Sequence, residues 1–300
     1  MNRNNKFHSI FLILFFFIYG FSQEKKDSIP SFNLVKIALV NQTDSYVTFP
    51  TDVGNIAPLM FEANISPSFI IRQRKDSRLL AVLTSQIVIR MYNEESFPVQ
   101  TPSYIPQISF YYAANNKQRK NQNTIFGRIA HHSNGQDDKF YNENESINLK
   151  SGNFATNFFE IGLIQTRYNK KLNAVNFFKS SFEVHPRSWM LTELHGQYSG
   201  FRWHNSFEAF KLPFLKSDKN DNPKFSLKLE TTLMLDSYNN LNTFDLDRLN
   251  ASLTFYYHPK FLEDIGLFVQ FYHGLDYYNI YFQEQLDVIR FGIMTEILRF

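Results

Sequence analysis

The sequence contains no cysteine among its 300 residues, and glycine, at 11 residues, is scarce. The lack of cysteine excludes disulfides, thiolate metal sites and a lipid anchor on an N-terminal cysteine. Beyond the N-terminal leader, no apolar run approaches the roughly 20 residues that a membrane-spanning helix needs. A formal net charge of +3 is too small to indicate a nucleic-acid partner.

Aromatic residues are abundant instead. With 33 Phe and 16 Tyr the aromatic content reaches 17%, yet the mean hydropathy is only −0.32. This combination is typical of a transmembrane β-barrel, because lipid-facing and interior side chains alternate along each strand and their hydropathies cancel.

The N-terminus predicts export. The basic residues Arg3 and Lys6 precede an unbroken apolar run at 10–19, and Gly20-Phe21-Ser22 supplies small residues for a signal peptidase. Because that run is too short to span a bilayer as a helix, we expect a signal peptide over 1–22. An exported chain rich in aromatic residues and without spanning helices points to the outer membrane of a Gram-negative envelope.

After a polar segment at 23–45, expected in the periplasm, residues 46–300 predict the barrel itself. Strand-like runs separated by turn signals number twelve, and bacterial single-chain barrels have an even number of strands. The runs are 46–50, 58–73, 79–92, 103–113, 124–134, 154–168, 174–185, 196–211, 224–237, 247–258, 266–274 and 288–300. We therefore expect an all-β fold, a twelve-stranded antiparallel transmembrane β-barrel.

The lengths of the connections predict the orientation of the barrel. The long connections at 136–153 and 275–287 suit the outer side of the membrane, and short charged turns suit the periplasmic side. The fifth strand then runs outward. The terminal Phe300 resembles the C-terminal aromatic residue by which such barrels are recognised for insertion.

The end of the fifth strand carries an unusual group of polar residues. Successive strand residues point to opposite faces, so His131 and Ser133 share a face with Ile129, whereas His132 shares the other face with Arg128. The first face is apolar up to its end and is therefore predicted to face lipid. Polar residues on the lipid face of a barrel are costly unless they have a function.

Hydrolysis would supply such a function. A serine hydroxyl needs an adjacent base to become nucleophilic, and the base needs a third group to orient it. His131 and Ser133 lie two apart on one face, and Asn157 has the matching parity on the next strand; Asn153 is a less favoured alternative nearer the loop. Gly135 permits a sharp turn that can direct a backbone N–H at an oxyanion.

The segment Ile129–Gln136 resembles the His-x-Ser-Asn-Gly segment of the outer membrane phospholipase A family. Similarity extends to other parts of the chain, namely Glu94–Pro98, Tyr104–Gln107, Tyr272–Asn279, Arg290–Gly292 and Phe300. The resemblance implies a twelve-stranded barrel with a Ser–His–Asn triad on its outer wall. The implied roles are general base for His131, nucleophile for Ser133, orienting amide for Asn157 and oxyanion N–H for Gly135.

The resemblance also implies Ca²⁺ and a homodimer. Calcium prefers oxygen ligands, including carbonyls and hydroxyls. The implied ligands are the carbonyl of Gln136 and a hydroxyl of Ser96 from a partner subunit. The remaining hydroxyl is assigned to Ser151, in a loop about a dozen residues longer than the family leads us to expect, where Asn153, Asp137 and Asp138 are alternatives.

From these features we expect a calcium-dependent outer-membrane phospholipase, active as a dimer, which hydrolyses the sn-1 and sn-2 acyl esters of membrane glycerophospholipids (phospholipase A1 and A2). The alternative is a barrel without enzymatic activity, such as a small porin or a structural anchor. A soluble exported esterase conflicts with Phe300 and with the lipid-facing parity of the site.

Other polar and aromatic residues have simpler interpretations. A transition-metal site on His131, His132, Asp137 and Asp138 is disfavoured, because the two histidines face opposite ways. Charges expected to fill the narrow interior are Arg128, Glu160, Arg167 and Glu230. Residues expected at the membrane interface or at strand ends are Trp189, Trp203, His185, His204 and His258.

Overall fold

The structure is a computed structural model of the chain. It describes residues 33–49, 52–72, 74, 77–114, 121–169, 174–213, 224–242, 245–259, 262 and 265–295. The predicted signal peptide at 1–22 and the terminal Phe300 lie outside these residues. Within the described ranges, no helix is long and apolar enough to cross a membrane.

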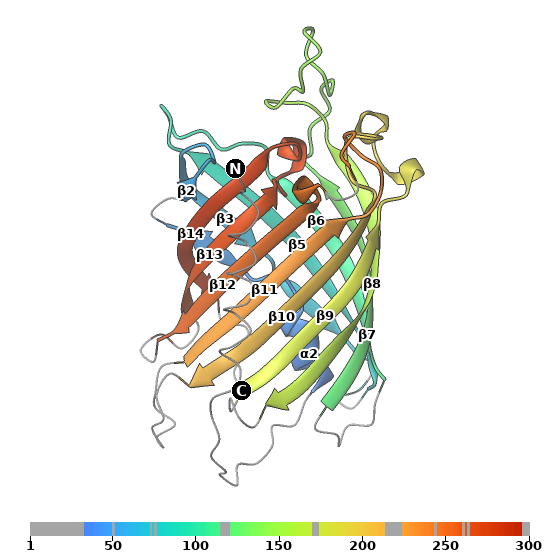
Figure 1. Ribbon diagram of the computed structural model, residues 1–300, viewed down its shortest axis with the longest axis vertical. Helices are drawn as coiled ribbons and strands as arrows, with labels where there is room; N and C mark the ends of the chain where they lie inside the picture. The colour runs from blue at the N-terminus through green and yellow to red at the C-terminus, as the bar shows by residue number, and fades with distance from the viewer. Residues whose placement is uncertain are drawn as a thin grey trace, which may run out of the picture.

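One antiparallel sheet runs through the whole molecule (Figure 1). Its segments are β1 (Tyr46–Thr48), β2 (Val53–Gly54), β3 (Leu59–Ile65), β4 (Ser68–Ile71), β5 (Leu79–Tyr92), β6 (Ser103–Ala113), β7 (Asn121–Ser133), β8 (Ala155–Asn169), β9 (Ala174–Val184), β10 (Phe201–Pro213), β11 (Lys224–Met234), β12 (Leu249–His258), β13 (Ile265–Leu275) and β14 (Gln285–Thr295). The described helices are α2 (Leu34–Val40) and the short 3-10 helices η1 (Arg187–Trp189), η2 (Thr192–Leu194), η3 (Leu246–Arg248) and η4 (Asn279–Tyr281).

The sheet closes into a barrel of twelve strands. Segments β1 and β2 both pair with β14 and form one interrupted strand, while β3 and β4 both pair with β5 and form another. The pairing of β1 with both β14 and β3 closes the ring, whereas β2 and β4 each pair with a single neighbour. The predicted fold class and strand number are confirmed.

The strands alternate between an apolar outer face and a mixed inner face. On β7, the outward Ile125 and Ile129 are each 45% exposed, whereas the inward Phe126 and Ala130 are buried. The same pattern on the other strands leaves large apolar side chains exposed around the wall, among them Leu163, Phe182, Phe207, Leu229, Phe255, Phe271 and Ile293. An apolar exterior on a closed barrel is the arrangement of a multi-pass outer-membrane protein.

Charged side chains fill the interior. Arg128 and Lys179 both pair with Glu160, at 3.1 Å and 3.0 Å, and Lys228 pairs with Glu230 at 3.1 Å. The predicted interior positions of Arg128, Glu160 and Glu230 are therefore confirmed. The prediction for Arg167 is wrong: this residue is exposed, because it shares the outward parity of β8.

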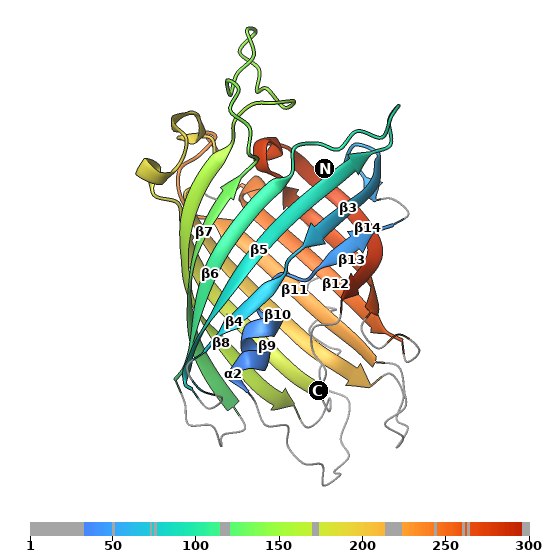
Figure 2. The same cartoon turned by 180° about the vertical axis from the view of Figure 1, so that it is seen from behind.

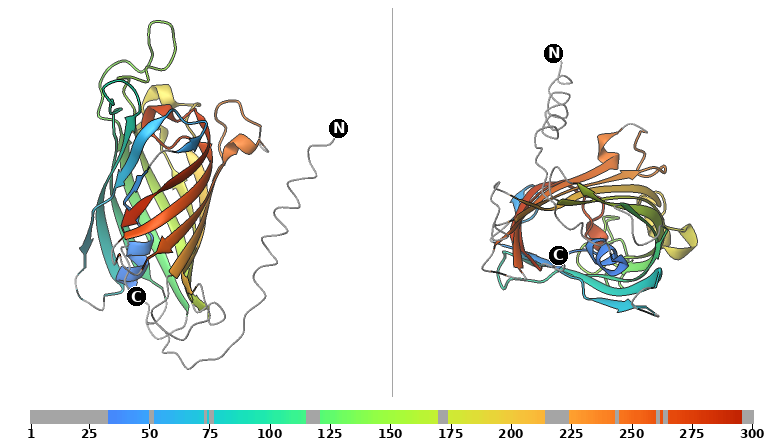
Figure 3. Two further views of the ribbon diagram at one scale, coloured as in Figure 1. Left: turned by 90° about the vertical axis from the view of Figure 1, so that its left-hand side faces the viewer. Right: turned by 90° about the horizontal axis from the view of Figure 1, so that it is seen from below.

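Helix α2 lies inside the barrel at the end opposite the long β7–β8 loop (Figures 2 and 3). The sequence predicts a polar periplasmic segment over 23–45, so this helix is a feature that the sequence does not indicate. Leu34, Ile37 and Ala38 follow helical spacing and bury their side chains against apolar inner-wall residues such as Phe126. After the helix, Gln42 donates a 2.6 Å hydrogen bond to the hydroxyl of Tyr111 on β6. The helix thus occupies the interior at this end.

Loops cover the other end of the barrel, with the β7–β8 loop projecting furthest (Figure 1). Five buried apolar side chains from three loops and their adjoining strand ends pack together there, and we call them the loop cluster: Phe140, Phe154, Leu194, Ile280 and Phe282. Gln197 also links these loops by hydrogen bonds to Tyr141 and Gln283. The loop end is therefore a packed layer.

Candidate active site

The outer end of β7 divides its side chains as the sequence predicted. His131 and Ser133 are partly exposed on the outward face, in line with Ile129. His132 between them points inward, is only 7% exposed and packs edge-on against Phe154, with ring centroids 5.0 Å apart. His132 is thus on the other side of the wall from His131 and Ser133.

Strand β8 brings Asn157 directly opposite His131. The Nδ1 atom of His131 lies 2.9 Å from Oδ1 of Asn157, within hydrogen-bonding distance. The structure therefore places together the imidazole and the amide that the sequence singled out. The alternative, Asn153, lies in the loop, where its backbone N–H donates to the carbonyl of Asp138.

The turn after Ser133 has the backbone conformation for which glycine was expected. Gly135 has a φ of +67°, which an L side chain rarely adopts. A Cβ at this position would lie 3.3 Å from the ring of Tyr104, the β6 residue opposite Ser133. The Tyr104 ring therefore packs along the outer face beside Ser133 and Gly135.

The side chain of Asn134 connects the two ends of the β7–β8 loop by hydrogen bonds. It is 1% exposed, donates to the carbonyl of Gly152 at 2.8 Å and accepts from the N–H of Phe154 at 3.0 Å. Its Oδ1 also accepts a weaker hydrogen bond from the N–H of Gln136. The turn that carries Gly135 is thus fixed by a buried amide that both donates and accepts hydrogen bonds.

The loop base gathers several of the oxygen ligands proposed from the sequence. Residue Asp138 forms a β-bridge with Gly152, so Gln136 and Ser151 belong to segments that lie side by side. Ser96 lies apart in the β5–β6 loop, with a φ of +67°. Across the described residues, no group of three His, Cys, Asp or Glu side chains is placed to hold a metal ion.

One residue of the site was not predicted for its role. The Nδ2 atom of Asn157 donates a 2.8 Å hydrogen bond to the backbone carbonyl of Trp189, in η1 of the β9–β10 loop. The sequence placed Trp189 at the membrane interface, and its ring is indeed 44% exposed. A backbone carbonyl carries no sequence signal, so this contact could not be found from residue types.

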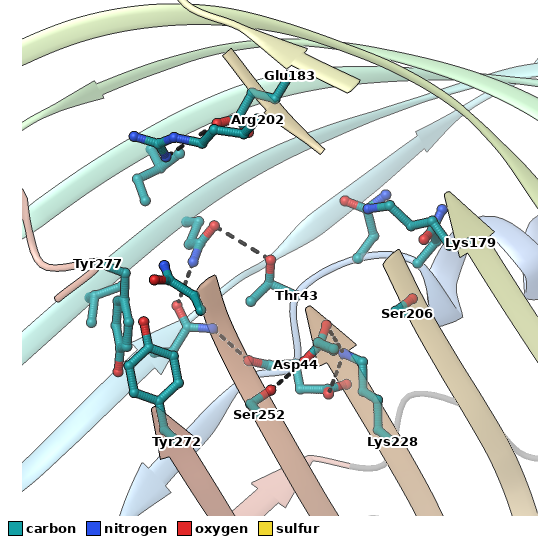
Figure 4. A pocket seen from close by; sticks show the side chains of 18 of the residues that line it. Thr43, Asp44, Lys179, Glu183, Arg202, Ser206, Lys228, Ser252, Tyr272 and Tyr277 are labelled. Atoms are coloured by element: carbon teal, nitrogen blue, oxygen red, sulfur yellow. Dashed lines mark hydrogen bonds and ion pairs between the residues drawn. The ribbon is translucent and has the colours of Figure 1, made fainter. Parts of the chain in front are cut away.

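The interior of the barrel holds a separate cavity of about 460 Å³ (Figure 4). Its lining carries charges of both signs, including Lys179, Glu183, Arg202 and Lys228. His131, Ser133 and Asn157 do not line this cavity, which lies behind the wall that carries them. Any chemistry of these three residues is therefore directed at the outer surface of the barrel.

Known structures share this fold. Over 91% of this chain and 95% of theirs, it resembles outer membrane phospholipase A from Escherichia coli (TM-score 0.57, 12% identity) and a variant of that enzyme with an active-site asparagine changed to alanine (TM-score 0.55, 12% identity). It also resembles a Salmonella typhi outer membrane phospholipase dimer with bound calcium (TM-score 0.55, 10% identity, 92% of this chain and 94% of that one). No protein-family profile and no curated sequence matches the chain.

Proposed function

We propose that this protein is an outer-membrane phospholipase that hydrolyses acyl ester bonds of glycerophospholipids. The observation that carries the proposal is the hydrogen bond between His131 and Asn157 on the outward face, two residues from Ser133 on the same face. An oriented imidazole beside a hydroxyl is the arrangement that activates serine. The fold shared with known outer membrane phospholipases supports the same conclusion.

In the proposed reaction, the hydroxyl of Ser133 attacks the ester carbonyl of the lipid. His131 removes the hydroxyl proton through Nε2 and returns it to the leaving alcohol, which leaves an acyl group on Ser133. Asn157 holds the imidazole through Nδ1. The N–H of Gly135, presented by the left-handed turn, donates to the oxyanion. Water then hydrolyses the acyl enzyme by the same proton transfers.

The location of these residues suits a lipid substrate. They lie on the apolar outer wall, where Ile129 and Phe159 are 45% and 38% exposed and can contact acyl chains. A phospholipid in the outer leaflet could reach Ser133 by lateral diffusion, without leaving the membrane. We propose both sn-1 and sn-2 esters as substrates, hence phospholipase A1 and A2 activity.

Calcium is proposed as the cofactor. The ligands available at the loop base are hard oxygens, which calcium prefers: the carbonyl of Gln136, the hydroxyl of Ser151 and the carboxylates of Asp137 and Asp138. The bridge between Asp138 and Gly152 keeps these segments adjacent, which supports a calcium site at the loop base. When bound, the ion would supply positive charge next to the developing oxyanion.

A homodimer is proposed together with calcium. Ser96 lies in the β5–β6 loop, and we propose that it is contributed as a ligand by the partner subunit, as the family resemblance implies. The Salmonella typhi protein was solved as a dimer with bound calcium. Two apposed apolar walls would also enclose the acyl chains, whereas the wall of a monomer is open. Activity would then depend on dimerisation.

The alternative, a small porin, rests on the charged interior cavity. Two features oppose it: α2 occupies the interior at one end, and the loop cluster packs across the other. A porin also gives no reason for an oriented His–Asn pair on the outer wall. A structural anchor without enzymatic activity would also leave the oriented His–Asn pair on the outer wall unexplained.

Refolded protein in detergent is expected to release fatty acid from phospholipid micelles when Ca²⁺ is present. EDTA should suppress turnover, and added Ca²⁺ should restore it while an equal concentration of Mg²⁺ should not, because magnesium demands a tighter octahedral geometry. Fatty-acid release can be followed by titration. Absence of release at any Ca²⁺ concentration would contradict the proposed activity, and full activity in EDTA would contradict the calcium requirement.

A further inference from the structure

The segment 187–191 of the β9–β10 loop lies along the outer end of β8 and contacts three consecutive residues there. The carbonyl of Trp189 accepts a hydrogen bond from Asn157, and Met190 forms a β-bridge with Thr156. The N–H of Leu191 donates to the carbonyl of Ala155 at 3.1 Å. The loop thus extends the sheet by a short stretch directly beside the candidate active site.

This segment is held from both sides of the barrel wall. On the outside, the Trp189 ring packs against Phe159, the next outward residue of β8 after Asn157, with centroids 4.8 Å apart. On the inside, Met190 and Leu191 pack against the loop cluster. The position of the Trp189 carbonyl is therefore set by side-chain packing on either face together with the backbone pairing to β8.

The hydrogen bond from Asn157 has a consequence for His131. An amide has a donor at one end and an acceptor at the other, and a rotation by 180° exchanges them. The Trp189 carbonyl can only accept, so it keeps the amide nitrogen on its own side and leaves Oδ1 facing His131. Because Oδ1 can only accept, Nδ1 of His131 must carry the proton.

The tautomer decides whether the histidine can act as a base. With the proton on Nδ1, the Nε2 atom of a neutral imidazole has a free lone pair, which can take the proton of Ser133. With the amide reversed, Asn157 would donate to Nδ1 and favour the proton on Nε2, where it would block that transfer. The orientation of one amide therefore selects between an active and an inactive imidazole.

We propose that Trp189 is a positioning residue, whose ring anchors the loop on Phe159 and whose carbonyl fixes the Asn157 amide and thereby the tautomer of His131. The inference rests on the proposed function, since it assigns Ser133 and His131 their roles in hydrolysis. It adds Trp189, from the β9–β10 loop, to Ser133, His131 and Asn157, the three residues that the sequence identifies.

The test compares Trp189→Ala, Trp189→Phe and Trp203→Ala. The second tryptophan is a matched control, because its ring is 38% exposed on the same outer wall and bonds Ser180 rather than the site. Trp189→Ala should lower kcat about tenfold to a hundredfold, the usual cost of losing an orienting contact, with little change in KM. Trp189→Phe should recover most of this loss, because a phenyl ring can still pack on Phe159.

A double-mutant cycle with Asn157→Ala separates positioning from direct contact with lipid. If Trp189 acts through Asn157, Trp189→Ala should lower the residual activity of Asn157→Ala by less than about twofold. An equal loss in both backgrounds, or a loss in KM alone, would overturn the inference. Heat-modifiable migration on gels verifies that each variant is folded, and a loss of kcat that coincides with loss of the folded band would also overturn it.

The two proposals fail differently. If Ser133→Ala is inactive but Trp189→Ala keeps the wild-type kcat, the positioning role is wrong and the proposed function stands. If the wild-type protein releases no fatty acid, the proposed function is wrong, and the positioning role is wrong with it.

Discussion

Replacing Ser133 by alanine is expected to lower fatty-acid release from phospholipid micelles by at least about a thousandfold, because loss of the nucleophile removes the covalent step altogether. The barrel should stay folded. Ser133 is a partly exposed residue at the end of β7, and its backbone pairing with β8 does not depend on the hydroxyl. The measurements are release rate and heat-modifiable gel migration.

Ser180→Ala is the matched control for this variant. Ser180 is also a serine on the outer wall, on β9, where it accepts a hydrogen bond from Trp203. Its replacement should leave the release rate within about twofold, since surface substitutions usually have small effects. Undiminished release from Ser133→Ala would show that the hydroxyl is not the nucleophile.

The second large effect is expected from two adjacent histidines that face opposite sides of the wall. His131→Ala should lower kcat by about 10²–10⁴-fold, the range for loss of a general base. His132→Ala should leave the release rate within about threefold, because His132 points into the interior, against Phe154, and acts through packing. The His132→Ala substitution should instead lower the thermal stability of the barrel.

This pair of variants tests the strand register as well as the chemistry. A one-residue slip of β7 would exchange the faces of the two histidines. Similar losses of activity from both variants, in protein that remains folded, would contradict the assignment of His131 alone to the site. A larger loss of activity from His132→Ala than from His131→Ala would show that His132, not His131, belongs to the site.

The barrel and the face on which the site lies could be predicted from the sequence because both depend on a two-residue period. Alternation along β7 separates His131 and Ser133 from His132, and the same alternation on β8 selects Asn157. Antiparallel pairing through one loop then brings Asn157 opposite His131. These inferences need only the order of residues within two neighbouring strands.

Other features depend on contacts that residue order does not encode. Helix α2 is too short to be recognised by itself, and it is stabilised by burial of Leu34 and Ile37 inside a barrel that must already exist. The Trp189 contact uses a backbone carbonyl from the β9–β10 loop. The charge of Arg167 favours an interior position, but its parity on β8 places it on the outer wall.

The β7–β8 loop is so long that the proximity of its two ends could not be predicted from the sequence. Gln136 and Ser151 are separated in the sequence by most of the loop. The hydrogen bond from Asn134 to Gly152 and the bridge between Asp138 and Gly152 nevertheless bring the two ends of the loop together. The structure thus places the segments of Gln136 and Ser151 side by side, a proximity that residue order does not encode.

Covalent labelling of the protein by a serine-reactive sulfonyl fluoride tests the central claim, that Ser133 is an activated nucleophile, most directly. In the presence of Ca²⁺ and detergent, mass spectrometry should find a single adduct, on Ser133, which is lost in Ser133→Ala and strongly slowed in His131→Ala. An unlabelled wild-type protein, or an adduct on another serine that forms equally well in His131→Ala, would contradict it.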